Sequence, residues 1–421
     1  MERVRILIVA EAVTLAHVAR PLALAAGLDP RRFEVHLAFD PRFDALIGAL
    51  PHTRHEIRSI GTDRFLDALD RGVPVYTADD LRRYVGDDER LIAGVAPAVV
   101  VGDFRLSLSV SARRARVPYA AIANIHWSPC ARPRFPLPEL PITRALGVGL
   151  ARPLVALARP LAFALHARPL NRVRREHGLP SLGPDLRRTY TDADEVLYAD
   201  LPDLAPPHSL GPGHRFLGPV LWSPAIPVPD WWAGLPADRP LVYVTPGTSG
   251  RRGLLDATLR ALADLPVTVV AAAGSERSSA AARNAHVAAY LPGMEAARRA
   301  AVVVCNGGMA VQQALACGRP VLGLPANMDQ HLSMRSVVDA GAGLLLRSER
   351  ARPEAIARAV SRLLGEPSFR LRAEALAARF AAYDAPSAFA SAVRELADVS
   401  SRSTGSRVDR DAAGRPPPIR P

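Results

Sequence analysis

The sequence lacks lysine altogether, since all 53 of its lysine-or-arginine positions are arginine. A lysine-bearing phosphate loop and a Schiff-base lysine are therefore excluded. Three cysteines in 421 residues are too few for a disulfide framework or a zinc site, which favours a reducing compartment. Aromatic residues make up only 5%, and the arginines are scattered, so the net charge of +12 does not indicate nucleic-acid binding.

The first thirteen residues place basic side chains before an apolar run, as a signal peptide does. The run is short, Glu11 interrupts it, and no small-residue cleavage site is evident. We therefore interpret residues 5–10 as the first core strand. The expected location is the cytoplasm. A position on the cytoplasmic face of the membrane is the alternative.

Apolar residues make up 49% of a chain that is too long for one ordinary core. Short apolar runs, such as residues 98–102, 119–123 and 241–245, alternate with helical patterns. This alternation is typical of α/β domains with parallel sheets. The sequence therefore predicts two α/β domains.

Residues 302–330 form the most informative stretch. A β-branched run at 302–304 precedes Gly307 and Gly308, and a helical pattern follows. Such a turn lets the backbone approach a ligand, and the free N–H groups of the helix that follows favour an anion, above all a phosphate. The stretch ends in a loop that carries Asp329 and Gln330.

This stretch resembles the donor-binding motif of GT-B-fold glycosyltransferases that use nucleotide sugars. The residues that keep the motif's spacing are Gly318, Pro320, Pro325, Asp329 and Gln330. The motif's histidine is replaced by Cys305 or Asn306, depending on the end from which the spacing is counted. Its glutamate, which binds ribose in the family, is replaced by Gln313, a weaker acceptor.

The resemblance implies an α/β protein of two Rossmann-like doubly wound domains that face each other across a cleft. The expected parts are an acceptor-binding domain (1–217), a linker (218–240), a nucleotide-sugar-binding domain (241–384), a helix returning to the first domain (385–399) and a disordered tail (400–421).

The resemblance also assigns the donor-binding residues. A small-residue turn after the strand at 241–245 is expected to contact the diphosphate. Tyr290 is expected to stack on the nucleotide base, with burial at a strand end as its alternative. Asp329 and Gln330 are expected to bind sugar hydroxyls. The full predicted donor set is Gly247, Thr248, Ser249, Tyr290, Asn306, Gly307, Gly308, Gln313, Asp329 and Gln330.

A base is needed to deprotonate an acceptor hydroxyl, and neutral imidazole suits this role near pH 7. His17 lies where relatives carry such a histidine. Asp103 follows the buried run at 98–102, at the sheet edge where ligands bind, and would orient His17. The plainer alternatives are a helix residue without chemistry for His17 and a helix cap for Asp103.

Three further residues are predicted to line the acceptor cleft: Arg105, His126 and Trp127. His126 is also an alternative to His17 as the base. For Trp127, packing in the core is the alternative to lining the cleft.

Residues 145–170 repeat the sequence ARPL three times among alanine, leucine, valine and phenylalanine. Prolines and arginines interrupt any clean membrane span. We interpret the segment as a proline-kinked helix pair that walls the acceptor side. The alternative is a peripheral membrane or lipid-acceptor surface.

The predicted function is inverting, metal-independent transfer of a hexose from a UDP- or dTDP-sugar to a hydroxyl of an apolar small-molecule or lipid acceptor. No cofactor and no metal are expected. The Asp-x-Asp pairs Asp192/Asp194 and Asp409/Asp411 imitate a metal motif, but two carboxylates define no site. The alternatives are a nucleotide-sugar 2-epimerase of the same fold and a non-catalytic auxiliary homologue.

Overall fold

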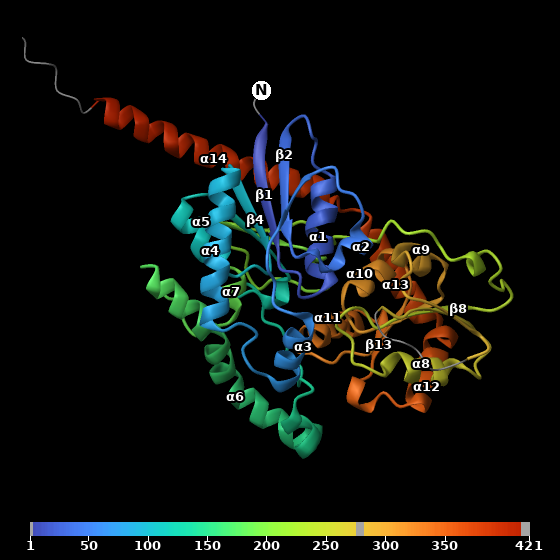
Figure 1. Ribbon diagram of the computed structural model, residues 1–421. Coiled ribbons are helices and arrows are strands. Elements are labelled where there is room, and N and C mark those ends of the chain that lie inside the picture. Colours follow the sequence, from blue (N-terminus) through green and yellow to red (C-terminus); the bar gives the residue numbers. More distant parts are fainter. Residues whose placement is uncertain (1–2, 275–281, 414–421) are drawn as a thin grey trace, which may run out of the picture.

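The computed structural model describes residues 3–274 and 282–413, with side chains described up to residue 399. It contains two parallel sheets, each flanked by helices (Figure 1). The predicted fold class, two doubly wound α/β domains, is confirmed.

The first sheet has seven parallel strands in the order β3-β2-β1-β4-β5-β6-β7. Its strands are β1 Val4–Ala10, β2 Phe33–Phe39, β3 Thr53–Glu56, β4 Val99–Asp103, β5 Tyr119–Ala123, β6 Glu195–Tyr198 and β7 His214–Phe216. Its helices are α1 Leu15–Ala26, α2 Asp44–Ile47, α3 Thr62–Arg71, α4 Ala78–Val95, α5 Leu108–Ala115, α6 Pro141–Glu176 and α7 Arg187–Tyr190.

The second sheet has six parallel strands in the order β10-β9-β8-β11-β12-β13. Its strands are β8 Leu241–Thr245, β9 Thr268–Ala272, β10 Ala285–Ala288, β11 Val302–Cys305, β12 Val321–Gly323 and β13 Gly343–Leu345. Its helices are α8 Leu254–Leu262, α9 Gly293–Arg299, α10 Met309–Ala316, α11 Met328–Asp339, α12 Pro353–Gly365 and α13 Pro367–Phe380.

Both sheets reverse their winding direction at one point, between β1 and β4 in the first and between β8 and β11 in the second. Ligands of open α/β sheets bind outside the carboxyl ends of the strands at such a point. The register aligns Ala10 with Asp103 and Thr245 with Cys305, so the loops after these strands meet in pairs. The fold therefore predicts one half-site in each domain.

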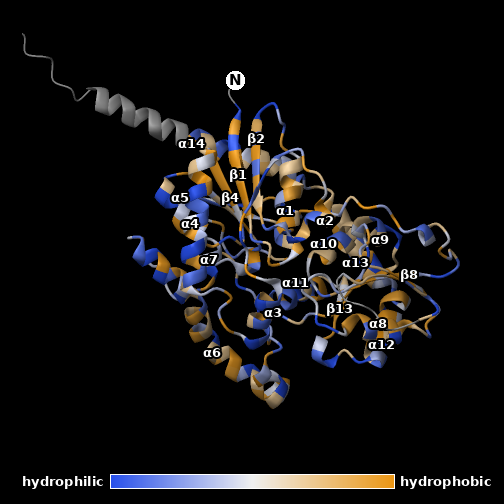
Figure 2. Cartoon of the chain, in the orientation of Figure 1, coloured by the Kyte–Doolittle hydropathy of each residue, from blue (hydrophilic) through white to orange (hydrophobic). Residues whose placement is uncertain are grey.

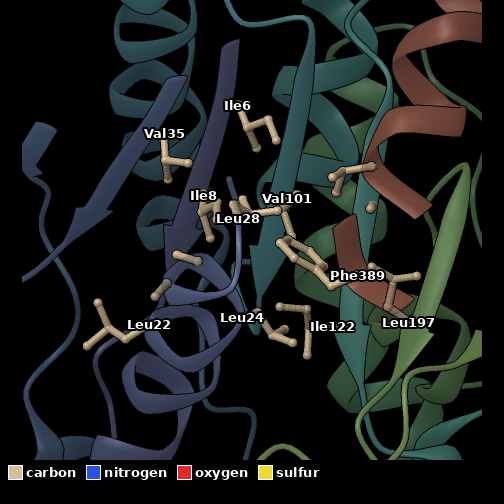
Figure 3. Packing of buried hydrophobic residues seen from close by; sticks show 14 of the residues in the cluster. Ile6, Ile8, Leu22, Leu24, Leu28, Val35, Val101, Ile122, Leu197 and Phe389 are labelled. Carbon is tan, nitrogen blue, oxygen red and sulfur yellow. The ribbon is translucent and has the colours of Figure 1, made fainter. Parts of the chain in front are cut away.

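The last helix, α14 Ala385–Ala413, leaves the second domain and covers the first sheet. Its Phe389 packs between Leu24, Val101 and Ile122 in the core (Figure 3). The prediction of disorder from residue 400 is corrected, because α14 continues to Ala413. The chain has no proline between Pro386 and Pro416 to stop the helix. Residues 414–421 lie outside the described part of the chain.

Helix α6 also differs from its prediction in detail. It is interrupted at Gly147, whose φ of +72° only glycine adopts readily, and not at a proline. Pro153, Pro160 and Pro169 all lie inside the helix. Because this helix is largely exposed, water can bond the carbonyls that the prolines leave without an N–H partner.

Candidate active site

His17 and Asp103 meet at the switch point of the first sheet. The His17 Nδ1 atom lies 2.7 Å from Asp103 Oδ1. Arg20, one turn further along α1, donates from Nε to Oδ2 (2.9 Å) and from Nη2 to Oδ1 (2.7 Å). Asp103 is fully buried, and a buried carboxylate between these groups acts as the acceptor. Nδ1 of His17 therefore carries the proton, and Nε2 is the ring nitrogen left for a substrate proton.

Phe104 fixes the plane of the His17 ring. The two rings stack with centroids 4.7 Å apart and planes 11° from parallel. Phe104 has a φ of +58°, an uncommon conformation for a bulky side chain, directly after the strand that ends in Asp103. Such local backbone strain often occurs at functional sites, where the surrounding fold holds the residue in place.

Ser249 links the two turns of the second domain. Its hydroxyl accepts a hydrogen bond from Asn306 Nδ2 (3.2 Å) and another from Gln330 Nε2 (3.1 Å). The next residue back, Thr248, accepts from the backbone N–H of Leu15 in the first domain (3.3 Å). The turn after β8, the turn after β11 and helix α11 therefore form one connected platform.

The glycine turn before α10 needs its glycines. Gly307 has a φ of +95°, and a Cβ there would lie 2.8 Å from the carbonyl oxygen of Gln330. Gly247, with a φ of +65°, lies beside Asn306. Gly307 and Gly308 both line the cavity between the domains, so the N-terminus of α10 faces that cavity.

The structure decides which residue takes the position of the family's histidine. Cys305 ends β11 inside the core, where burial raises the pKa of its thiol to about 12. Asn306 lies in the turn itself, and its Oδ1 accepts from the N–H of Gly308 (3.0 Å). Asn306 is therefore the one of the two that lies in the turn, and its amide bonds hold that turn.

Asp329 crosses the cleft to the first domain. Its Oδ1 accepts from Trp127 Nε1 (2.7 Å) and from His126 Nε2 (2.9 Å). Burial alone would raise the pKa of Asp329, but the hydrogen bond and charge of His126 and the bond from Trp127 lower it to about 2. Burial likewise opposes the charged form of His126, yet Asp329 raises the pKa of this histidine. The side chain of Asp329 is nevertheless 55% exposed, so solvent screens its attraction to His126.

The cavity enclosed by these groups has a volume of about 700 Å³, within the usual range for ligand pockets. His17, Gly307 and Asp329 line it, and so does one face of α6. Its first-domain side is apolar and aromatic. The aromatic rings that line it there are Phe104, Trp127, Phe163 and Tyr190, and Phe135 contacts Trp127 and Phe163.

Arg105 is among the residues that line the cavity, as predicted, but its guanidinium is engaged by acidic groups of the protein. Its side chain is fully buried, and Nη1 donates to Glu11 (2.8 Å) while Nε donates to Asp88 (3.0 Å). Its guanidinium also stacks on the ring of Tyr84. These bonds fix the side chain beside the cavity, and its contact with an acceptor stays a prediction.

Gln313 and Gln330 both form hydrogen bonds within the protein through their amide groups. Gln313 Nε2 donates to the carbonyl of Trp222 in the linker (2.6 Å), and only 5% of the residue is exposed. Gln330 bonds Ser249 and accepts from Ala326 N–H (2.9 Å). Gln330 holds the platform and also lines the cavity, whereas Gln313 is not among the residues that line it. The predicted contacts of Gln313 with ribose and of Gln330 with a sugar hydroxyl stay predictions.

Tyr290 lies on the loop after β10, the edge strand of the second sheet, and is half-buried. It is not among the residues that line the cavity. Its stacking on a nucleotide base stays a prediction.

Three residues of the site escaped sequence reasoning: Arg20, Phe104 and Glu139. Arg20 had a usable signal, because it lies three residues after His17 and so on the same helical face. Phe104 and Glu139 gave none, since their roles depend on backbone conformation and on contacts with distant segments.

The acidic pair Asp192/Asp194 is engaged by other groups. Asp192 pairs with Arg113 (2.9 Å) and Arg174, and Asp194 accepts from Tyr119 N–H (2.9 Å). The side chains of Asp409 and Asp411 lie outside the described residues. In the part of the chain that is described, no group of three or more His, Cys, Asp or Glu side chains is arranged to hold a metal ion.

Two facing doubly wound domains with a cavity between their switch points define the GT-B class of glycosyltransferases. Solved structures agree with this fold. Spinosyn rhamnosyltransferase SpnG superposes with a TM-score of 0.67 at 21% identity, covering 94% of this chain and all of that one.

Sequence comparison gives the family. The chain is 54% identical over 380 residues to a PGL/p-HBAD biosynthesis glycosyltransferase of Mycobacterium tuberculosis, covering 90% of this chain and 89% of the relative. It is 55% identical to a PGL/p-HBAD biosynthesis rhamnosyltransferase of Mycobacterium bovis, covering 90% and 84%. Residues 254–418 match the model of the erythromycin biosynthesis protein CIII-like C-terminal domain. The chain belongs to the PGL/p-HBAD biosynthesis glycosyltransferase family and is a glycosyltransferase, as the sequence predicts.

Proposed function

We propose that the enzyme transfers a hexose, of which rhamnose is the best candidate, from a dTDP-sugar or UDP-sugar to a hydroxyl of an apolar acceptor, with inversion and without a metal. The observation that carries the proposal is the buried Asp103 carboxylate 2.7 Å from His17, beside an apolar cavity that also reaches the glycine turn of α10. The rhamnosyltransferase relatives support the sugar. Solved complexes of SpnG with thymidine diphosphate and with its aglycone support the two kinds of substrate.

In this mechanism Nε2 of His17 takes the proton of the acceptor hydroxyl. The hydroxyl oxygen then forms the new bond to the anomeric carbon as the bond to the nucleoside diphosphate breaks on the opposite face. Asp103 stabilises the imidazolium that forms. The backbone at Gly307 and Gly308 and the N-terminus of α10 stabilise the negative charge on the departing diphosphate.

Asp329 would bind the hydroxyl groups of the donor sugar. His126 and Trp127, which contact Asp329 across the cleft, would lie on the acceptor side. The aromatic wall of the cavity suits an apolar acceptor. The proposal places the enzyme in the cytoplasm of a bacterium.

The test is transfer from dTDP-rhamnose and from UDP-sugars to a long-chain alkyl phenol, with the product identified by mass spectrometry and its anomeric configuration by NMR. Replacing His17 with alanine should lower the transfer rate by about 10²–10⁴-fold and leave donor binding intact. Added EDTA should leave the rate unchanged.

His166→Ala is the matched control. His166 lines the same cavity, but its Nδ1 donates to the carbonyl of Ala162 in its own helix (2.7 Å). The proposal fails if the His17 variant keeps more than about a tenth of the rate or if both variants lose equally. Epimerised donor without acceptor would identify a 2-epimerase instead.

A further inference from the structure

Helix α6 carries most of the exposed large apolar side chains of the protein. Seven of the twelve in the described part of the chain lie on this one helix. They are Ile142, Leu146, Leu150, Leu154, Leu157, Leu161 and Leu165. Figure 2 shows hydrophobic stretches along α6, which lies at the outer edge of the molecule. Such a concentration on one element marks an interaction surface.

The leucines form a stripe on one face. Leu150, Leu157, Leu161 and Leu165 are 69%, 82%, 65% and 48% exposed, and their spacing of seven, four and four residues keeps them aligned. We call these four residues the leucine stripe.

The opposite face of the same helix lines the cavity. Val155, Arg159, Phe163 and His166 all contribute to the cavity wall, and they lie roughly half a turn away from the leucine stripe. Arg159 also stacks over the ring of Phe135 inside the aromatic wall. Helix α6 therefore separates the acceptor cavity from the outside with a single layer of side chains.

Both ends of α6 are fixed to the body of the protein. Near its C-terminal end, Arg174 is buried and donates to the carbonyl of Ser109 (2.9 Å). Just before its N-terminal end, Glu139 accepts from the hydroxyl of Ser348 (2.5 Å) and from the N–H of Glu349 (3.0 Å) in the second domain. The segment is thus attached to the second domain just before the helix begins and to the first domain near its C-terminal end, and the exposed leucines lie between these two attachments.

The charge along α6 is mostly positive. Between residues 131 and 176 the sequence has nine arginines and two acidic residues, Glu139, which is buried, and Glu176, which pairs with Arg82 and Arg172. Arginines near a membrane surface are attracted to anionic lipid headgroups. An apolar stripe with this charge matches an anionic bilayer better than it matches another protein surface, whose charges are mixed.

Residues 141–176 are long and apolar enough to cross a membrane by length and composition, and only 6% of their most apolar window is buried. Arg152 and Arg159 lie in the middle of the helix, however, and the inner face belongs to the cavity. Ends fixed to both domains also keep the helix parallel to the protein surface. These features fit a helix that lies on a bilayer.

We propose that the leucine stripe docks the enzyme on an anionic lipid bilayer and that the acceptor passes from the bilayer beside α6 into the cavity. The passage of acceptor depends on the proposed function, whereas the docking does not. The occupant of the stripe is the lipid surface, and the acceptor class is a hydroxylated lipid that partitions into it.

The test compares vesicles of phosphatidylcholine alone with vesicles containing phosphatidylglycerol. The double variant Leu157→Asp/Leu161→Asp removes two leucines of the stripe that do not line the cavity. Leu371→Asp is the matched control, because Leu371 is 59% exposed on α13. Wild type and Leu371→Asp should sediment with the anionic vesicles, and the double variant should partition at least about tenfold more weakly.

Activity separates docking from chemistry. All three proteins should transfer sugar equally to a short water-soluble phenol without vesicles. With a lipid acceptor embedded in vesicles, the double variant should be slower by about tenfold or more. No transfer to either acceptor by any protein would count against the proposed function, and sedimentation would still test the docking.

Two results would overturn the docking proposal. One is wild-type protein that stays in the supernatant, or a double variant that sediments equally well. The other is a wild-type dimer in analytical ultracentrifugation that the double variant abolishes without any vesicle binding. That second result would make the stripe an interface between copies of this chain.

Discussion

Replacing Asp103 with asparagine tests the catalytic pair more closely than removing the base does. In the wild type Oδ1 accepts from both His17 and Arg20, and Oδ2 accepts from Arg20 alone. An asparagine oxygen at the Oδ1 position keeps two of these three bonds. The reverse orientation keeps only the bond from Arg20 Nε. We therefore expect Arg20 to hold the amide so that its oxygen still faces Nδ1 of His17.

The size of the effect follows from this orientation. The tautomer of His17 is preserved, and only the charge opposite the imidazolium is lost. A hydrogen bond to a charged group contributes about 1.5–3 kcal/mol, against about 1 kcal/mol for a neutral one. A difference of about 1–2 kcal/mol corresponds to a loss of about 5- to 30-fold in kcat/KM. Asp103→Asn should therefore be clearly less damaging than His17→Ala.

The same substitution should cost more in stability than in rate. Asp103 is fully buried and the side chain of Arg20 is 11% exposed, so the variant leaves a buried guanidinium without its carboxylate. Removing one partner of a buried pair costs about 3–5 kcal/mol. Urea denaturation would measure this loss.

The assay is kcat/KM for transfer to a soluble phenol at a temperature where donor binding shows both variants to be folded. Asp103→Asn with wild-type kcat/KM would remove Asp103 from the mechanism. A loss as large as that of His17→Ala would show that the amide turns and the wrong tautomer forms, which would refute the role assigned to Arg20.

Two further predictions concern contacts between the domains. The contact of His126 with Asp329 should be complete between about pH 4 and about pH 6.5. It should weaken as pH rises through the raised pKa of His126, and also as pH falls toward about 2, the pKa of Asp329. Interdomain fluorescence energy transfer should therefore fall as pH rises through the raised pKa of His126, and His126→Gln should abolish that dependence. An identical pH profile in the variant would contradict the prediction. Glu139→Gln should lower the free energy of unfolding by about 1–3 kcal/mol, because it weakens buried bonds to the Ser348 segment. Glu354→Gln, at an exposed position, is the control and should change the free energy of unfolding by less than about 0.5 kcal/mol.

The fold was predictable because its central strands are buried on both faces. Runs such as Val99–Asp103 and Val302–Cys305 are almost wholly apolar, which is what a doubly covered parallel strand requires. Strands β3 and β7 escaped because they are edge strands with polar sequences, Thr-Arg-His-Glu and His-Arg-Phe. Their pairing is specified by neighbouring strands and not by their own hydrophobic pattern.

The site was predictable where a side chain acts at the end of a strand, and it was not where the side chain turns inward. His17 and Asp103 follow adjacent strands, so the topology alone brings them together. Arg105 lies only two residues beyond Asp103, yet its side chain points to Glu11 and Asp88 in the core. The spacing of Arg105 in the sequence does not reveal this, because both carboxylates lie on segments far from it in the sequence.

The departures from the family motif also have a structural explanation. In the turn where the histidine is expected, the side-chain oxygen of Asn306 accepts from the N–H of Gly308, and its nitrogen donates to the hydroxyl of Ser249. Gln330 reaches the same hydroxyl from α11. These bonds hold the two turns and α11 in one arrangement, and they do not require Asn306 to contact a ligand. The shortened turn can therefore still present the backbone of Gly307 to a diphosphate, because its shape is held by amides around Ser249 and does not depend on the missing imidazole.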